Sequence, residues 1–364
     1  MPDLLRISNI QIQNFKNYKH TQIELGHYLH TVVCGANGIG KTNFLDAIYF
    51  LSLTKSAFHA DKQLITHEEL FCRLEALIYV ENTSKKVVVT YTPTEKKHFS
   101  VNNYHYTSLA EYIGQFPVVL IAPNDTDLIR EGSEDRRRFF DTLLCQIDKT
   151  YLQKLSEYNK ILKQRNAVLT SFKERKNVNS TLIEVYDEQL FPLMDFIYSS
   201  RKKLLEDMSP IIQKYYDLIA QATEKINVIY ISDCSDIDFK DHFKNSFQKD
   251  CFLERTTKGI HKDDFEFLLD ENLIKKFGSQ GQQKTFVIAL KFATFEILRN
   301  MLNITPILLL DDILDKLDQN RTEHLMEIVC QEPFGQVVVT EANTHRVAYI
   351  NQKKNWKIIE IDKL

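Results

Sequence analysis

The chain has 364 residues, of which 43% are hydrophobic and 26% charged, and this ordinary globular balance argues against a disordered protein. The formal net charge of -3 excludes a globally basic surface, so any nucleic-acid site must come from local clusters of Lys and Arg. The six cysteines form no CxxC pair, which argues against a disulfide framework or a zinc site. Because no apolar run approaches the roughly 20 residues that cross a bilayer and the first residues lack a signal-peptide pattern, we expect a cytoplasmic protein without a membrane partner.

Strand and helix signals alternate in the first third of the chain. Period-two alternation over 4–15 and an apolar run over 28–35 predict strands, and the spacing of apolar residues over 41–53 predicts a helix. Further strand-like runs then follow, over 71–80, 85–92, 98–103 and 116–123. The order strand, loop, helix near the start is typical of an α/β protein.

The texture changes between about 133 and 221 to long, charged, helix-compatible segments with only two prolines, Pro192 and Pro210. We expect a helical insertion whose helices are too short and irregular for a sustained coiled-coil seam. A hairpin over 264–277, turning at 270–272, and a helix over 280–302 are expected after it. The chain then returns to α/β texture, with strands over 306–310, 335–340 and 356–361 and a helix over 319–330.

The segment GANGIGKT, between the predicted strand and helix, fits the pattern G-x-x-x-x-G-K-[ST] of a phosphate-binding loop in the required context. The glycines let backbone N–H groups face a phosphate, the Lys reaches the β- and γ-phosphates, and the Thr hydroxyl is offered to Mg²⁺. The pattern therefore predicts a nucleotide site, with ATP as ligand, formed by the residues Gly35, Ala36, Asn37, Gly38, Ile39, Gly40, Lys41, Thr42 and Asn43.

A strongly apolar strand ends in two consecutive carboxylates, Asp311 and Asp312. A phosphate-binding loop needs a carboxylate from a second strand for its metal, and we assign Asp311 to Mg²⁺ together with Thr42. Asp312 is expected to orient or deprotonate the attacking water, which makes Asp312 and Lys41 the predicted catalytic residues. A strand capped by a helix N-terminal Asp is the alternative interpretation.

Six segments in chain order carry a resemblance: NFKNY (14–18), GANGIGKTN (35–43), the run 122–141, GIHKDDFEF (259–267), SQGQQK (279–284) and LLLDDILDKLD (308–318). Their order resembles the ABC-type ATPase heads of the SMC and DNA-repair class, and more narrowly the RecF family of bacterial recombination mediators. The resemblance implies an ABC-type P-loop head. Lobe I, a mixed sheet with helices, would comprise residues 1–121 and 290–364, and an inserted, mainly helical lobe II would comprise 122–289.

The resemblance also implies an ATP-controlled DNA-binding protein. In that family ATP binding drives formation of a homodimer on single-stranded and linear double-stranded DNA, near gaps and junctions. With RecR and RecO the protein helps to load RecA in repair and replication restart, and slow, DNA-stimulated ATP hydrolysis resets the dimer. Under this resemblance the signature segment that contacts the γ-phosphate held by a second copy is formed by Ser279, Gly281 and Gln282, and a loop at the dimer interface by Leu317 and Asp318.

Two positions depart from the ABC pattern. Thr340, followed by Glu341, stands where many such ATPases carry a switch His, so an imidazole cannot sense the γ-phosphate there. The Gln expected between the lobes is not evident, and Asn124 or Asp125 stands nearest to it. Both departures are compatible with slow turnover.

Several basic residues are candidates for contacts with DNA phosphates, namely Lys16, Lys19, Lys55, Lys62, Arg136, Arg137 and Arg138. For the arginines the alternative is a helix start capped by Ser133, with Arg137 or Arg138 paired to Asp135 or Asp141. His261, Asp263 and Asp264 are expected to brace the signature segment rather than bind a metal.

Three other functions fit the sequence less well. A transporter nucleotide-binding subunit shares the ATP motifs but would carry LSGGQ, Asp-Glu and a switch His, where this chain has GSQGQQ, Asp-Asp and Thr340. An SMC-like structural protein would need a much longer insertion. A P-loop kinase or GTPase would leave SQGQQK unexplained, and no N-K-x-D guanine motif is present.

Overall fold

The computed structural model describes residues 2–95, 97–174, 180–221, 223–313, 319–331, 333–343, 345–348 and 356–361. The chain divides into two units. The first comprises 1–126, 214–222 and 284–364, and the second comprises 127–213 and 223–283. The lobe limits expected from the sequence remain a prediction. Within the described part, no helix is both long and apolar enough to span a membrane.

A parallel sheet organises the first unit. Its five strands, counted within the described ranges, follow the order β15-β3-β14-β13-β8. The strands are β3 (His30–Cys34), β8 (Val118–Ile121), β13 (Ile307–Leu310), β14 (Val337–Glu341) and β15 (Lys357–Glu360). The strands β8, β13 and β14 are buried along their whole length, as expected for the apolar strands of a parallel sheet. Because all five strands run in the same direction, their carboxyl ends meet at one edge.

A second, mainly antiparallel sheet belongs to the same unit. Its order is β12-β1-β4-β5-β6-β7, with β2 paired to β1, and β12 runs parallel to β1. The strands are β1 (Asp3–Phe15), β2 (Tyr18–Glu24), β4 (Cys72–Val80), β5 (Thr83–Tyr91), β6 (His98–Val101), β7 (Tyr104–Tyr106) and β12 (Ile304–Thr305). Alternate residues of β4 are buried, so this sheet has one face toward the core.

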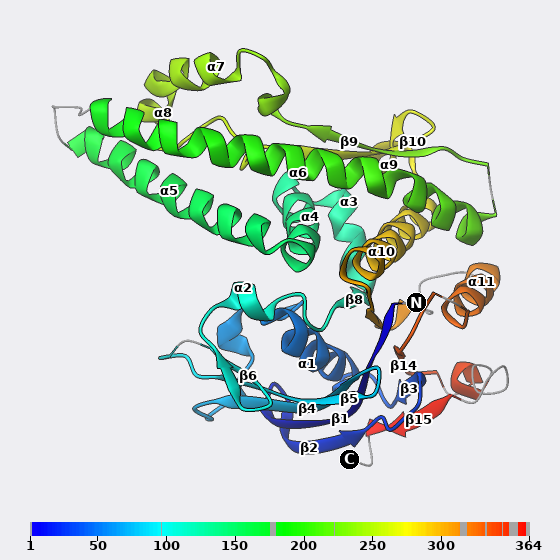
Figure 1. The fold of residues 1–364 in the computed structure, drawn as a ribbon. Coiled ribbons are helices and arrows are strands. Elements are labelled where there is room, and N and C mark those ends of the chain that lie inside the picture. The colour runs from blue at the N-terminus through cyan, green and yellow to red at the C-terminus, as the bar shows by residue number, and fades with distance from the viewer. Residues whose placement is uncertain are drawn as a thin grey trace. The chain divides into compact units, whose positions relative to one another are not determined.

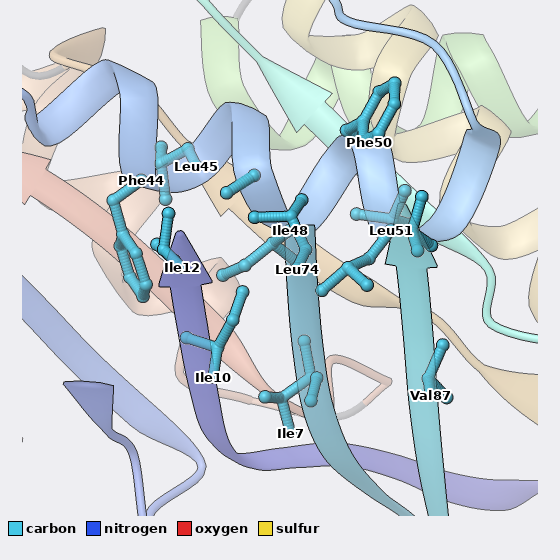
Figure 2. Close-up of a cluster of buried hydrophobic side chains, with 14 of the residues drawn as sticks. Ile7, Ile10, Ile12, Phe44, Leu45, Ile48, Phe50, Leu51, Leu74 and Val87 are labelled. Carbon is cyan, nitrogen blue, oxygen red and sulfur yellow. The ribbon is translucent and has the colours of Figure 1, made fainter. Parts of the chain in front are cut away.

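Helix α1 (Lys41–Leu53) lies over the antiparallel sheet, and its predicted bounds are confirmed. Figure 2 shows Phe44, Ile48 and Leu51 of this helix facing the side chains of β1, β4 and β5. The same buried cluster includes Val33, Leu309 and Val338 of the parallel sheet. The helix is therefore held on both sides by apolar packing, which fixes the position of the loop before it.

The remaining elements of the first unit connect these layers. They include α2 (Leu109–Tyr112), the 3-10 segments Asp61–Gln63 and Pro123–Thr126, and α11 (Gln319–Val329). Helix α10 (Gln280–Leu302), whose predicted bounds are also confirmed, has its first residues in the second unit and the rest in the first.

The second unit is mainly helical, as predicted. Its helices are α3 (Asp127–Arg130), α4 (Ser133–Ile147), α5 (Lys149–Glu174), α6 (Ser180–Ala220), α7 (Phe239–Asn245), α8 (Phe247–Leu253) and α9 (Ile274–Phe277). The last residues of α6, from 214 on, belong to the first unit. Helices α5 and α6, drawn in green in Figure 1, lie side by side, and the buried Arg165 joins them through an ion pair to Asp187 at 2.7 Å. A small sheet adds β9 (Ile226–Ile231), β10 (Asp264–Leu269) and β11 (Asn272–Leu273), and Asp233–Ser235 forms a 3-10 turn.

Two predictions about this unit are wrong. Helix α6 spans 41 residues with Pro192 and Pro210 inside it, so the helices of the insertion are not uniformly short. Buried side chains along the helix, among them Met194 and Met208, provide tertiary packing that offsets the cost of the prolines. The hairpin after β10 does turn at Asp270 and Glu271, both at positive φ, but β11 ends at Leu273 and a short helix follows.

Candidate nucleotide-binding site

The phosphate loop follows β3 at the carboxyl edge of the parallel sheet. Gly38 and Gly40 have φ angles of 82° and 121°, which other residues rarely adopt. Helix α1 starts at Lys41 with no side-chain cap and no acidic residue in its first turn, so its N-terminal N–H groups and dipole favour an anion. The Lys41 Nζ atom donates to the carbonyls of Gly35 and Ala36 at 3.0 and 3.1 Å. The ammonium group therefore lies across the loop where a phosphate would bind.

The turn between β1 and β2 holds this loop from outside. The Asn17 amide donates to the carbonyl of Ile39 at 2.8 Å and accepts from the Asn43 amide at 2.7 Å. The Tyr18 hydroxyl donates to the carbonyl of Gly40 at 3.0 Å. The sequence pattern assigned neither Asn17 nor Tyr18 a role, although both lie in the segment NFKNY.

Asp311 follows β13 and meets Thr42 across the sheet edge. The Thr42 hydroxyl lies 2.9 Å from both carboxylate oxygens of Asp311, and the Thr340 hydroxyl donates to the Oδ1 atom at 2.8 Å. Burial raises the pKa of Asp311, while the bonds from Thr340 and Thr42 lower it. The two residues assigned to Mg²⁺ from the sequence, Thr42 and Asp311, are thus in direct contact.

Asp312 borders the same cavity as the loop. This cavity has a volume of about 490 Å³ and is lined by Asn37, Gly38, Gly40, Lys41, Thr42, Asn43, Pro123 and Asp312. Asp312 has a positive φ of 41°, and its backbone N–H donates to the Thr340 hydroxyl at 2.9 Å. One carboxylate oxygen, Oδ1, is buried and has no hydrogen-bond partner within the part of the chain that the structure describes. Such an oxygen is suited to a ligand, a water or a cation that enters the cavity.

Glu341 adds a second carboxylate near Asp312. Its side chain is buried, and its Oε1 atom accepts the N–H of Asn343 at 2.8 Å. Burial raises the pKa of Glu341, the charge of Asp312 raises it further, and the charge of Lys41 lowers it. Glu341 is therefore close enough to the candidate site to interact with the charges of Asp312 and Lys41. The sequence motifs had assigned it no role in the site.

The signature segment belongs to the second unit, and two of its residues, Ser279 and Gln282, are hydrogen-bonded to each other at the start of α10. The N–H of Gln282 donates to the Ser279 hydroxyl at 3.2 Å, and the N–H of Ser279 donates to the Gln282 amide oxygen at 2.7 Å. This reciprocal pair is a capping box. Ser279 is exposed and its hydroxyl keeps a proton to donate, while Gly281 is half-buried. The buried Gln283 holds the segment through bonds to the carbonyls of Ile274 and Gly278.

The residues near the missing Gln have structural contacts. The Asp125 carboxylate accepts from the N–H of Ala122 at 2.7 Å and from Lys291 Nζ at 2.9 Å. Asn124 is exposed. Leu317 and Asp318, expected at a dimer interface, lie outside the described residues.

Three candidate DNA contacts make internal ion pairs or hydrogen bonds. Lys16 lies 2.6 Å from the buried Asp46, with a side chain only 6% exposed. Arg136 makes a bidentate pair with Asp264, and Arg137 donates to the Ser133 hydroxyl and to the carbonyl of Asp263. Because these three side chains already have partners within the protein, they are poor candidates for contacts with DNA phosphates.

The rest of the basic set is more open to solvent. Arg138 is 66% exposed beside Glu134 and Asp135. Lys19, Lys55 and Lys62 are exposed as well. The alternative interpretation of the arginines is confirmed in part, because Arg138 lies 3.3 Å from Asp135. Its cap by Ser133 is wrong: α4 begins at Ser133 with Gly132 as its cap residue and no side-chain cap bond.

The segment GIHKDDFEF braces the second unit. His261 contacts the Tyr158 hydroxyl at 2.6 Å and the carbonyl of Thr256 at 3.0 Å. Asp263 pairs with the buried Arg201 at 2.9 Å, and burial raises the pKa of Asp263 to about 6. These contacts and the Asp264 pair tie the segment to α4, α5 and α6, whereas the expectation was that it braces residues 279–284.

Comparison with known proteins defines the class. The family described as "RecF/RecN/SMC N terminal domain" matches residues 6–361. A solved SMC head domain from Pyrococcus furiosus shares the fold with a TM-score of 0.53 at 16% identity, over 94% of this chain and 91% of that one. The chain thus has the fold of an SMC-like, ABC-type ATPase head, the fold class expected from its motifs.

Closer relatives narrow the assignment. The chain is 41% identical to the DNA replication and repair protein RecF of Cytophaga hutchinsonii, over 98% of this chain and 95% of that protein. It is 38% identical to RecF of Flavobacterium johnsoniae, over 98% and 100%. A structure described as "recombination mediator protein RecF-ATP in RecFOR pathway" superposes with a TM-score of 0.86 at 28% identity, over 93% and 92%. This chain belongs to the RecF family.

Proposed function

We propose that this protein is an ATP-controlled DNA-binding recombination mediator that acts in DNA repair and replication. The observation that carries the proposal is the junction at the sheet edge, where Thr42 of the phosphate loop meets Asp311 at 2.9 Å and Asp312 borders the same cavity. A relative of known structure is described as RecF bound to ATP, which supports ATP as the ligand.

Each residue of the cavity has a role under this proposal. The loop residues Gly35–Asn43 bind the phosphates through backbone N–H groups, and Lys41 neutralises the β- and γ-phosphates. Thr42 and Asp311 would hold Mg²⁺, which supplies positive charge to the phosphates when bound. The residues fit that ion, because Mg²⁺ is usually bound by one or two protein oxygens together with phosphate and water. Asp312, with its buried unpartnered Oδ1 atom, orients the attacking water.

ATP would then control dimerisation. The two lobes, 1–121 with 290–364 and 122–289, would place the nucleotide and the signature segment on different parts of the head. Ser279 and its neighbours Gly281 and Gln282 would bind the γ-phosphate held by a second copy. The exposed Ser279 hydroxyl, with a proton to donate, supports this role. Turnover would be weak, since no His occupies the position of Thr340.

The dimer would bind single-stranded and linear double-stranded DNA at gaps and junctions, and would help to load RecA together with RecO and RecR. The related RecF-ATP structure is described as part of the RecFOR pathway, which supports these partners. Exposed Lys19, Lys55, Lys62 and Arg138 are the remaining candidates for phosphate contacts. Because a dimer doubles their number, ATP should strengthen DNA binding and steepen its salt dependence.

A filter-binding titration tests the proposal directly. Gapped duplex, plain duplex and single-stranded DNA are titrated with protein at several salt concentrations, with and without ATP and Mg²⁺, while light scattering reports the dimer. We expect ATP to raise both the dimer fraction and the DNA affinity, most strongly on gapped duplex. Equal DNA affinity with and without ATP at every salt concentration would refute the proposal that ATP controls DNA binding.

A further inference from the structure

One hydroxyl group touches both carboxylate residues that follow β13. The Thr340 Oγ1 atom donates to Asp311 Oδ1 at 2.8 Å and accepts the backbone N–H of Asp312 at 2.9 Å. Thr340 is 0% exposed and lies on β14, which pairs with β13 through Leu310 and Val339. The sheet therefore fixes the hydroxyl between the two residues, and both its donor and an acceptor lone pair are used.

The bond to Asp311 differs in kind from the one that Thr42 makes. Thr42 is itself a proposed Mg²⁺ ligand, so its hydroxyl has a second task when the metal is bound. Thr340 has no such task, and its hydrogen bond constrains the rotation of the Asp311 carboxylate whether or not Thr42 stays in contact. Hydrogen bonds of this kind, behind a metal-binding carboxylate, orient the ligand and tune its affinity for the metal.

The bond to Asp312 acts on the backbone. Asp312 has a φ of 41°, a conformation that residues other than glycine adopt in few places. A buried acceptor for its N–H stabilises that conformation, which determines where the Asp312 side chain leaves the chain at the cavity border. A residue without an oxygen at position 340 would leave this N–H and the Asp311 carboxylate without their shared partner.

We propose that Thr340 is a positioning residue that couples the two carboxylates, holding Asp311 for the metal and Asp312 for the attacking water. It would serve this site in place of the switch His, acting through the carboxylates instead of touching the phosphate. The inference rests on the proposed ATP site.

The test measures the Mg²⁺ requirement of nucleotide binding. Binding of a fluorescent N-methylanthraniloyl derivative of ATP is recorded in EDTA and during Mg²⁺ titration for the wild type and for Thr340→Val, which removes the hydroxyl at nearly constant volume. We expect unchanged binding in EDTA and a half-saturating Mg²⁺ concentration about tenfold higher, equivalent to about 1.4 kcal/mol. In steady-state ATP hydrolysis, kcat should fall while KM for ATP changes little.

Thr31→Val is the matched control. Thr31 is a buried threonine of β3 in the same sheet, and its hydroxyl has no hydrogen-bond partner among the described residues, so its removal should leave the Mg²⁺ midpoint unchanged. Thr340→Ser keeps the hydroxyl and should behave like the wild type, whereas Thr340→Ala should behave like Thr340→Val.

Equal Mg²⁺ midpoints for the Ser and Ala variants at position 340 would overturn the inference, even if the Val variant fails to fold. A Ser variant as impaired as the Val variant would also overturn it, because packing alone would then explain the loss. Wild-type protein that does not bind the nucleotide would instead refute the ATP site itself. Wild-type protein that binds it equally well with and without Mg²⁺ would refute the assignment of Thr42 and Asp311 to the metal.

Discussion

Replacement of Gly40 by Ala tests how the β1–β2 turn shapes the phosphate loop. Gly40 has a φ of 121°, and a Cβ atom at this position would lie 2.4 Å from the Asn17 amide nitrogen. The new methyl group must therefore displace Asn17, which otherwise bonds Ile39 and Asn43. We expect folded protein with a distorted loop and weakened ATP binding.

The magnitude follows from these contacts. Holding a residue other than glycine at this φ costs about 1–3 kcal/mol, and loss of the two Asn17 hydrogen bonds costs about 0.5–1.5 kcal/mol each. If ATP binding requires the native loop, the sum of roughly 2–6 kcal/mol is subtracted from the binding free energy. The dissociation constant should then rise by roughly 30-fold to more than 10⁴-fold.

Calorimetric titration with ATP measures the effect, and Gly38→Ala is the matched control. Gly38 also has a positive φ, 82°, but among the described residues no atom outside Gly38 and its two chain neighbours lies within 4 Å of the place that a methyl group would take. The control therefore carries backbone strain without the collision. The double variant Asn17→Ala with Gly40→Ala should recover part of the lost affinity. Equal ATP affinity for the two single glycine variants would refute the inference that Asn17 holds the phosphate loop in its native conformation.

Three further predictions concern turnover, the dimer and pH. Lys41→Met should abolish ATP binding and ATP-dependent dimerisation, whereas Asp312→Asn should permit both and block ATP turnover. If light scattering shows a dimer that forms equally well without nucleotide, the proposal that ATP controls dimerisation is contradicted. Ser279→Arg should retain ATP binding by calorimetry and lose the ATP-dependent dimer, because the larger cation replaces the hydroxyl of the capping box; a dimer that still forms with ATP would contradict its role. Burial lowers the pKa of His261 to about 4 from 6.5, so the unfolded chain binds more protons between these values and stability is lost as the pH falls through this window. In urea unfolding followed by circular dichroism, the free energy of unfolding of His261→Gln should fall less steeply over this pH window than that of the wild type. The raised pKa of Asp263 has the opposite effect on stability, but Asp263 is present in both proteins and so does not change the comparison.

The local elements of the site were predictable from the sequence. The glycine loop, Lys41 and Thr42 form a contiguous pattern, and the helix bounds 41–53 and 280–302 follow from the spacing of apolar residues. Two carboxylates directly after an apolar strand mark a sheet edge in the same way, because parallel strands end together. Each of these inferences depends on neighbours within about one turn or one strand of the chain.

Partners distant in the sequence were not predictable. Lys16 and Arg136 were candidates for DNA contacts, but Lys16 pairs with Asp46, and Arg136 pairs with Asp264, 128 positions away. A charge looks the same in sequence whether it faces solvent or a buried carboxylate, and only the tertiary fold distinguishes the two.

The sequence by itself determined the family, the phosphate loop and the carboxylate pair, because these are encoded in short runs of adjacent residues. Tertiary structure decided what holds them: Asn17 and Tyr18 on the loop, and Thr340 between Asp311 and Asp312. Those contacts come from separate strands, and their hydrogen bonds exist only once the sheets bring the strand ends together.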